Sequence, residues 1–160
     1  MNIGYPDFKS LISAELHLRE SFANPEARLQ VLVQNSLSKL EPGLELIHTY
    51  YPVDPRFGYE GEIDILANDS RGLYVVMELK DGALERATWA QLFTYAWILK
   101  QSLAKDADVR TMAVCGSLQR DALYSYYELK RKIRDPPYLR VFQYSLHPPT
   151  SISFSEIPTS

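Results

Sequence analysis

G-E-I-D-I-L-A-N-D-S-R-G-L-Y-V-V-M-E-L-K, residues 61–80, is the stretch that decides the fold of this chain. Its two ends are rich in β-branched and other apolar residues, and turn-forming residues occupy 68–72 between them. The pattern predicts two neighbouring β-strands joined by a short turn, with Asp69 as a turn residue.

Alternation along these strands places charged side chains on a shared face. Glu62, Asp64 and Leu66 share one face of the first strand, and Glu78 and Lys80 share one face of the second. If the strands pair, Asp64 lies near Glu78 and Lys80. An unpaired charge beside a core costs roughly several kcal/mol, so these charges require a counter-charge or a metal ion.

A divalent-cation site for phosphodiester hydrolysis explains the charges chemically. Mg2+ prefers oxygen ligands and keeps several waters, so the carboxylates of Asp64 and Glu78, together with substrate phosphate, are a sufficient ligand set. Mg2+ or Mn2+ held there would lower the pKa of a bound water and stabilise charge on the phosphate. The ammonium of Lys80 is placed to hold the attacking water or a phosphate oxygen.

The same residues carry a family resemblance. D-I-L, then E-L-K fourteen residues later, then Q-L-x-x-Y on a predicted helix, resemble the PD-(D/E)XK, or restriction-endonuclease-like, nuclease superfamily. The match is closer to the catalytic domain of the NucS/EndoMS endonucleases and covers roughly residues 25 to 100. Five ordered pieces carry it: P-E-A-R-L (25–29), L-E-P-G-L-E-L (40–46), G-E-I-D-I-L-A-N-D (61–69), V-V-M-E-L-K (75–80) and Q-L-F-T-Y (91–95).

The resemblance implies roles for three more residues. It places Glu26, on the first core helix, in the carboxylate cluster as a catalytic residue and metal ligand; alternatively, Glu26 only favours the helix dipole. It implies that Gln91 is a catalytic residue that orders a metal-bound water or contacts phosphate. Tyr95 then braces Lys80 or the backbone and is a candidate nucleic-acid contact.

Periodicity predicts an α/β fold, and the resemblance implies a restriction-endonuclease-like mixed β-sheet flanked by α-helices. The expected domain covers residues 1–146 and includes an N-terminal helix, and residues 147–160 are expected to be an extended or disordered tail. The predicted helices are 7–22, 25–40, 83–104 and 117–132, and the predicted strands besides the first two are 44–51, 109–115 and 138–146.

Two further segments are candidates for nucleic-acid binding. Arg56 lies in a loop with Phe57 and Tyr59, which either clamp a nucleic-acid strand or pack within the loop. Near the end of the last predicted helix, a basic cluster is either a phosphate contact or a solvated helix end. Its candidate residues are Lys130, Arg131 and Lys132.

Composition limits the class of protein. The chain has 160 residues, 46% hydrophobic and 23% charged, which fits one globular domain. No apolar run reaches the length of a membrane span and the start is not a signal peptide, so we expect a cytoplasmic protein. The single cysteine, Cys115, excludes an internal disulfide and a thiolate zinc cage. The net charge of -3 is not that of a general nucleic-acid coat protein.

These patterns favour a metal-dependent endonuclease, most readily one that acts on DNA, and a homodimer or a partner protein is possible. The alternative is a non-catalytic module of the same fold that binds nucleic acid or a partner protein. In that case a salt bridge between Lys80 and the two acids explains the charges without a metal. The NucS-like enzymes also carry an N-terminal DNA-binding domain, so mismatch recognition is not carried over.

Overall fold

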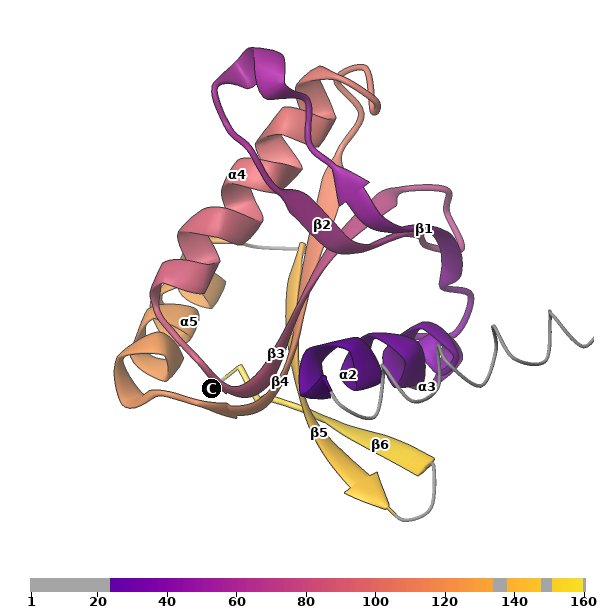
Figure 1. Cartoon of the computed structure of the whole chain (residues 1–160). Helices are drawn as coiled ribbons and strands as arrows, with labels where there is room; N and C mark the ends of the chain where they lie inside the picture. The colour runs from indigo at the N-terminus through magenta and orange to yellow at the C-terminus, as the bar shows by residue number, and fades with distance from the viewer. Residues whose placement is uncertain (1–23, 134–137, 148–150, 160) are drawn as a thin grey trace, which may run out of the picture.

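The computed structural model describes residues 24–133, 138–147 and 151–159. Six strands form one sheet in the order β1-β2-β3-β4-β5-β6, with helices on both faces (Figure 1). The strands are β1 (Glu45–Pro52), β2 (Glu62–Asn68), β3 (Tyr74–Leu84), β4 (Val109–Leu118), β5 (Leu139–His147) and β6 (Ser151–Glu156). The helices are α2 (Pro25–Gln34), α3 (Leu37–Leu40), the short 3-10 helix η1 (Pro55–Phe57), α4 (Ala87–Gln101) and α5 (Arg120–Lys132).

The sheet is mixed, as the sequence predicted. The pairs β1–β2, β2–β3 and β5–β6 are antiparallel, whereas β3–β4 and β4–β5 are parallel. The parallel pairs require crossovers, which α4 and α5 provide on one face of the sheet, while α2 and α3 cover the other face (Figure 1). The fold class is therefore confirmed as α/β with a mixed sheet flanked by helices.

Each face of the sheet has its own buried cluster of apolar side chains. Along β3, Val75, Met77 and Leu79 pack with α2, whereas Val76 packs with the cluster under α4 and α5. Because β3 is covered on both faces, its apolar residues are nearly continuous, as expected for a central strand. Any charged residue on β3 therefore lies close to a core.

The first core helix begins where the sequence predicted and ends earlier. Asn24 Oδ1 accepts hydrogen bonds from the backbone N–H groups of Glu26 and Ala27, so Asn24 caps α2. The predicted helix 25–40 is interrupted, because Asn35 and Ser36 separate α2 from α3. Such residues favour turns over helix interiors.

The predicted helix 83–104 was wrong at its start. β3 continues to Leu84, which pairs in parallel with Leu118, and α4 begins only at Ala87. Leu84 is fully buried, so tertiary packing outweighs its helical spacing. A close approach of two glycines accompanies this extension, since a Cβ on Gly116 would lie 3.3 Å from backbone atoms of Gly82. β4 likewise runs to Leu118, so Ser117 does not open α5 as predicted.

The segment expected to be an extended or disordered tail after residue 146 contains a strand of the sheet. Residues 151–156 form β6, which pairs antiparallel with β5 and extends the sheet. The strand is held because Ile152 is buried in the α2-side cluster and its carbonyl accepts a hydrogen bond from Lys39 Nζ at 3.1 Å. The predicted helix 7–22 lies outside the described residues.

Candidate active site

The β2–β3 hairpin brings Asp64 and Glu78 together. Its ladder pairs Ile65 with Met77, so Asp64 and Glu78 are the next two residues and lie opposite each other where the ladder ends. Beyond the end of the ladder, the side chain of Asp64 continues the contact with β3, because its Oδ2 accepts a hydrogen bond from the backbone N–H of Leu79 at 2.7 Å. The predicted proximity of these two acids is confirmed, and it results from period-two alternation on paired strands.

Glu78 is a buried carboxylate with an unpaired oxygen. Its side chain is 5% exposed, and Oε1 lies 3.5 Å from Lys80 Nζ. Oε2 is also buried and has no hydrogen-bond partner. Burial and the neighbouring charge of Asp64 raise the pKa of Glu78 to about 7, against the opposing effect of Lys80. The single positive charge of Lys80 does not balance the two negative charges of Glu78 and Asp64.

Asp64 and Lys80 complete the centre of the site. Burial raises the pKa of Asp64, while the Leu79 hydrogen bond and the charge of Lys80 oppose that rise. The side chain of Lys80 is 31% exposed, so its ammonium reaches solvent while remaining beside Glu78. The site thus has two carboxylates, Asp64 and Glu78, and one ammonium, Lys80. This excess of negative charge favours the binding of a further cation.

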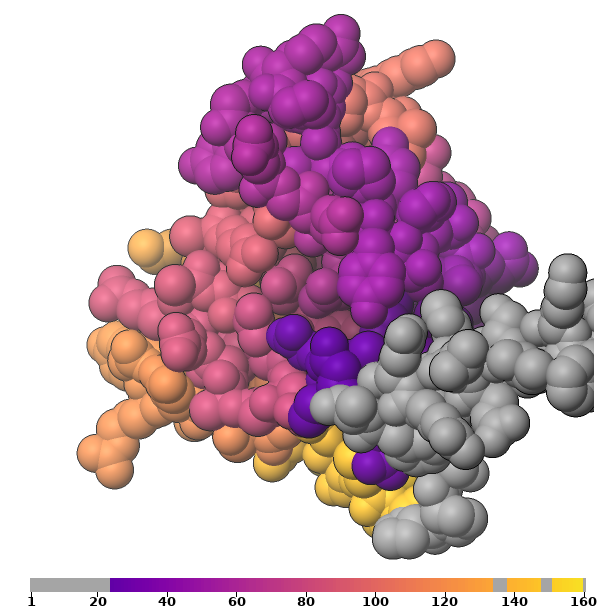
Figure 2. Space-filling model, viewed as in Figure 1, coloured from indigo at the N-terminus to yellow at the C-terminus, as the bar shows by residue number. Residues whose placement is uncertain are grey.

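Glu26 lies at the rim of this centre, on the first turn of α2. It is exposed, and its charge contributes to the raised pKa of both Asp64 and Glu78. In the space-filling view the start of α2, in indigo, lies at the surface close to the purple strands β1 and β2 (Figure 2). Within the described residues, no three His, Cys, Asp or Glu side chains are arranged to hold a metal ion.

A small cavity beside Asp64 adds two residues that the sequence analysis missed. It has a volume of about 160 Å³ and lies between α2 and the β1–β2 hairpin. Gln30 and Tyr50 line it together with Glu26, Asp64 and Leu79. Gln30 follows Glu26 by one helical turn, and that spacing was the available signal. Tyr50 had no comparable local signal.

The Tyr50 backbone has a positive φ of 50°, which side chains other than glycine rarely adopt. Burial raises the pKa of Tyr50, and the negative charges of Asp64, Glu26 and Glu62 raise it further. Its ring therefore lies within the electrostatic reach of the carboxylates. The cavity itself, with a volume of about 160 Å³, is large enough to hold a few water molecules.

Gln91 and Tyr95 form a pair on α4. Gln91 Nε2 donates a hydrogen bond to the hydroxyl of Tyr95 at 3.1 Å, and Tyr95 is 5% exposed. The Tyr95 hydroxyl packs against Gly61, at the start of β2, where a Cβ atom would collide with it. This contact agrees with a brace on the backbone. Among the described residues, no hydrogen bond or ion pair joins Gln91 or Tyr95 to Asp64, Glu78 or Lys80.

The predicted nucleic-acid contacts lie on other parts of the fold. Arg56, in η1, is exposed and forms an ion pair with Asp54 at 2.6 Å. On α5, Lys130 Nζ donates a hydrogen bond to the Leu139 carbonyl at 2.7 Å, and Arg131 pairs with Glu128. Lys132 is exposed at the end of α5. These basic residues belong to η1 and α5, whereas the carboxylates belong to β2 and β3.

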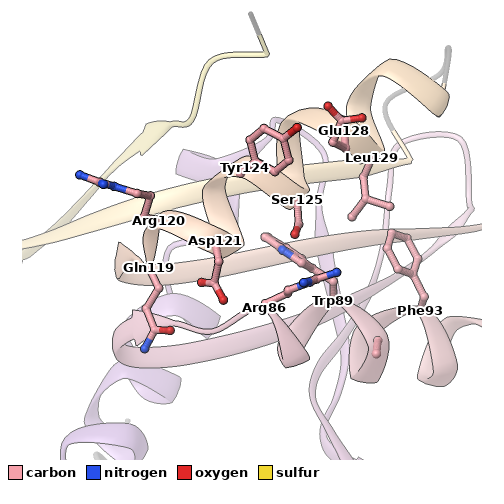
Figure 3. Close-up of a pocket in the computed structure, with 11 residues that line it drawn as sticks. Arg86, Trp89, Phe93, Gln119, Arg120, Asp121, Tyr124, Ser125, Glu128 and Leu129 are labelled. Atoms are coloured by element: carbon pink, nitrogen blue, oxygen red, sulfur yellow. The ribbon is translucent and has the colours of Figure 1, made fainter.

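A large groove elsewhere on the fold does not include the carboxylates. It has a volume of about 1050 Å³ and lies between α4 and α5, where Trp89, Phe93 and Tyr124 contribute aromatic surface (Figure 3). None of the predicted catalytic residues lines it. The groove is mostly apolar, so its chemistry differs from that of the carboxylate site.

Comparison with known proteins identifies the family and similar folds. The family described as "Endonuclease NucS C-terminal domain" matches residues 25–141. A repair endonuclease from Pyrococcus abyssi is similar in structure, with a TM-score of 0.58 and 26% identity over 78% of this chain and 47% of that chain. EndoMS in its apo form is similar at a TM-score of 0.55 and 28% identity, over 78% of this chain and 47% of its own.

A third structure, of an EndoMS–dsDNA2 complex, has a TM-score of 0.58 and 24% identity, over 76% of this chain and 46% of that chain, and it supports the fold alone. The chain thus spans about half the length of these solved structures. No curated protein matches the chain. Within the described residues, no helix is both long and apolar enough to cross a membrane. Because the family match covers most of its residues, the chain belongs to the family of the endonuclease NucS C-terminal domain.

Proposed function

We propose that the chain is a divalent-cation-dependent endonuclease that hydrolyses phosphodiester bonds in DNA, with a site of the PD-(D/E)XK type. One observation carries the proposal: Glu78 Oε2 is buried without a partner, beside Asp64. A buried carboxylate normally has partners for both oxygens. A cation that binds to this oxygen would account for both the burial and the missing partner.

The donor set fits Mg2+ or Mn2+. Both ions accept carboxylate oxygens, and a site with few protein ligands suits Mg2+ because it keeps several waters. Asp64 and Glu78 would hold the ion, and Glu26 would join them from α2. When bound, such an ion lowers the pKa of a water molecule and stabilises negative charge on the phosphate.

The side chains of the site have separate tasks in this proposal. The Leu79 N–H holds one oxygen of Asp64, which fixes the direction of that carboxylate. Glu78 forms an ion pair with the Lys80 ammonium at 3.5 Å, which holds the ammonium beside the carboxylates. Since Lys80 is partly exposed, it can donate hydrogen bonds to a phosphate oxygen or to the attacking water. Gln91 supports the site through Tyr95, which packs against the start of β2.

DNA is the proposed substrate because of the family. The matching family is the C-terminal domain of an endonuclease, and one similar structure is that of a repair endonuclease from Pyrococcus abyssi. A homodimer would present one site to each strand of a duplex, and this assembly remains a prediction.

The first test is cleavage of labelled single-stranded, duplex and branched DNA, with a matched RNA, in the presence of Mg2+, Mn2+ or a chelator. We expect cleavage of DNA that requires the ion and is lost in Lys80→Ala. Cleavage that persists in the chelator, or in Asp64→Ala, would contradict the proposal. Shifted DNA mobility without cleavage would favour a binding module.

The Lys80–Glu78 ion pair is the observation that favours this second candidate, a non-catalytic module that binds nucleic acid or a partner protein. At 3.5 Å, the pair compensates part of the charge without a metal ion. Calorimetry with Mg2+ or Mn2+ separates the two candidates. A metal site predicts binding that weakens in Asp64→Asn, whereas a simple ion pair predicts no binding in either protein.

A further inference from the structure

We propose that Gln30 is a positioning residue for Glu26, which its side-chain amide holds toward Asp64 and Glu78 when a divalent cation binds. The inference rests on the proposed function and adds a residue to it. Its starting point is that Gln30 Nε2 is buried and has no hydrogen-bond partner. Gln30 is 4% exposed, so solvent does not satisfy this donor.

An unpaired buried amide is uncommon in a folded protein. The cavity that Gln30 lines is shared with the acidic residues Glu26 and Asp64. Carboxylate oxygens accept hydrogen bonds from an amide N–H, so each of these acids is a chemically suitable partner for Gln30 Nε2. The cavity therefore contains both the donor and its candidate acceptors.

Glu26 is the better acceptor of the two. Asp64 Oδ2 is already held by the Leu79 N–H at 2.7 Å. Glu26 is exposed, and it lies four residues before Gln30 on α2, a spacing at which helical side chains meet. A turn of the Glu26 side chain into the cavity would satisfy Gln30 through one carboxylate oxygen and leave the other oxygen for the cation.

The same movement accounts for the incomplete carboxylate cluster. Within the described residues, Glu26, Asp64 and Glu78 do not form an arrangement that could hold a metal ion. Their charges repel one another, since Glu26 contributes to the raised pKa of both other acids. A cation removes this repulsion, and a hydrogen bond from Gln30 then fixes the orientation of the ligating carboxylate.

The test measures Mn2+ binding by calorimetry on the 160-residue chain, without DNA. We expect Gln30→Leu to weaken binding by about tenfold or more, as is usual for a residue that orients a metal ligand. Glu26→Gln should also weaken it, and the double variant should bind no more weakly than Glu26→Gln alone. Gln34→Leu, the same substitution one helical turn further along α2, is the matched control and should bind as the wild type does.

Thermal unfolding in chelator checks the folding of each variant. Because Gln30→Leu removes an unpaired buried amide, its melting temperature without metal should not fall below that of the wild type. Gln30→Met, which is closer in length to the original side chain, repeats the binding test if Gln30→Leu does not fold. A positioning role thus changes metal affinity without a loss of stability.

Two results would overturn the inference while the proposed function stands. One is Mn2+ binding that weakens in Asp64→Asn but is unchanged in both Gln30 variants. The other is equal weakening by Gln30→Leu with and without Glu26→Gln, which indicates a general structural effect. A wild-type chain that binds no Mn2+ would overturn the proposed function, and this inference with it.

Discussion

The fold contains two groups of charged side chains, each with buried members, and the groups differ in how completely their charges are paired. The carboxylate site consists of Asp64, Glu78 and Lys80, with Glu26 at its rim. The second group, which we call the charge network, joins segments that are distant in sequence. It consists of Glu41, Asp69, Arg110, Arg140 and Glu156.

In the charge network every acid has an arginine partner. Arg110 bonds to both oxygens of Glu41, at 2.7 and 2.8 Å, and to Asp69 at 3.1 Å. Arg140 bonds to Glu41 at 2.6 Å and to Glu156 at 2.7 Å. The hydrogen bond from Arg110 is the main reason that the pKa of Glu41 is lowered, and the hydrogen bond from Arg140 lowers the pKa of Glu156 in the same way.

The carboxylate site shows the opposite electrostatics. There burial raises the pKa of both Asp64 and Glu78, and a single lysine offsets only part of that rise. Asp64 lies near the start of β2 and Asp69 directly follows its end, five residues later and roughly 17 Å away along an extended strand. The comparison indicates that one end of the strand is organised for stability, whereas the other retains uncompensated charge that a ligand can use.

Removal of Arg110 should produce the largest loss of stability. Arg110→Met leaves Glu41 and Asp69 without their shared partner, and breaking a buried ion pair in this way costs about 3–5 kcal/mol. Urea unfolding measures the loss. Arg131→Met, the same change in an exposed pair on α5, is the control and should have little effect. Equal effects in both variants would contradict the importance of burial.

Lys80→Ala should have the next largest effect, and on catalysis rather than on stability. Loss of a donor that stabilises developing charge slows cleavage by about 100- to 1000-fold. The cleavage assay with Mg2+ measures this. Lys100→Ala is the matched control, because Lys100 also pairs with a carboxylate, Asp108, at 3.3 Å but lies outside the site. If Lys100→Ala slowed cleavage equally, the assignment of Lys80 would be wrong.

Glu78→Gln should stabilise the metal-free chain while it abolishes cleavage. The substitution removes a buried charge with an unpaired oxygen, and we expect a gain of about 1–3 kcal/mol near neutral pH. Urea unfolding in chelator measures the change. A loss of stability instead would indicate that the Lys80 ion pair outweighs the burial of Glu78.

The two groups should respond to pH in opposite directions. The lowered pKa values of Glu41 and Glu156 contribute stability above their unfolded values, near about 4, and this contribution is lost as the pH falls through the folded values. The raised pKa of Glu78 contributes stability that is complete below its unfolded value and is lost as the pH rises toward about 7. Thermal unfolding in chelator should be measured across this pH range. Arg110→Met should reduce the loss of stability that occurs as the pH falls below about 4. Glu78→Gln should reduce the loss of stability that occurs as the pH rises toward about 7.

Arg56→Ala should have the smallest effect. Arg56 is exposed and pairs with Asp54, the residue directly before η1, so the melting temperature should be unchanged. If Arg56 contacts phosphate, DNA affinity should fall and its salt dependence should weaken by about one charge. DNA binding measured at several salt concentrations tests this. An unchanged salt dependence would show that Arg56 does not contact phosphate.

Local pattern was sufficient to predict the centre of the site. Period-two alternation placed Asp64, Glu78 and Lys80 together, because a hairpin with a short turn leaves few possible registers. Gln30 was missed although it is one helical turn from Glu26, since its significance depends on burial and an absent partner. Those properties exist only after α2 packs on the sheet.

The sequence by itself determined the α/β class, the β2–β3 hairpin and the start of α2, because each depends on neighbours within a few residues. Only the tertiary structure decided where β3 ends, that β6 joins the sheet, and that Arg110 reaches Glu41, which is 69 residues away. Those features depend on burial and on charge pairing between distant segments. Such energies arise when the sheet assembles and are not encoded in any single stretch of the chain.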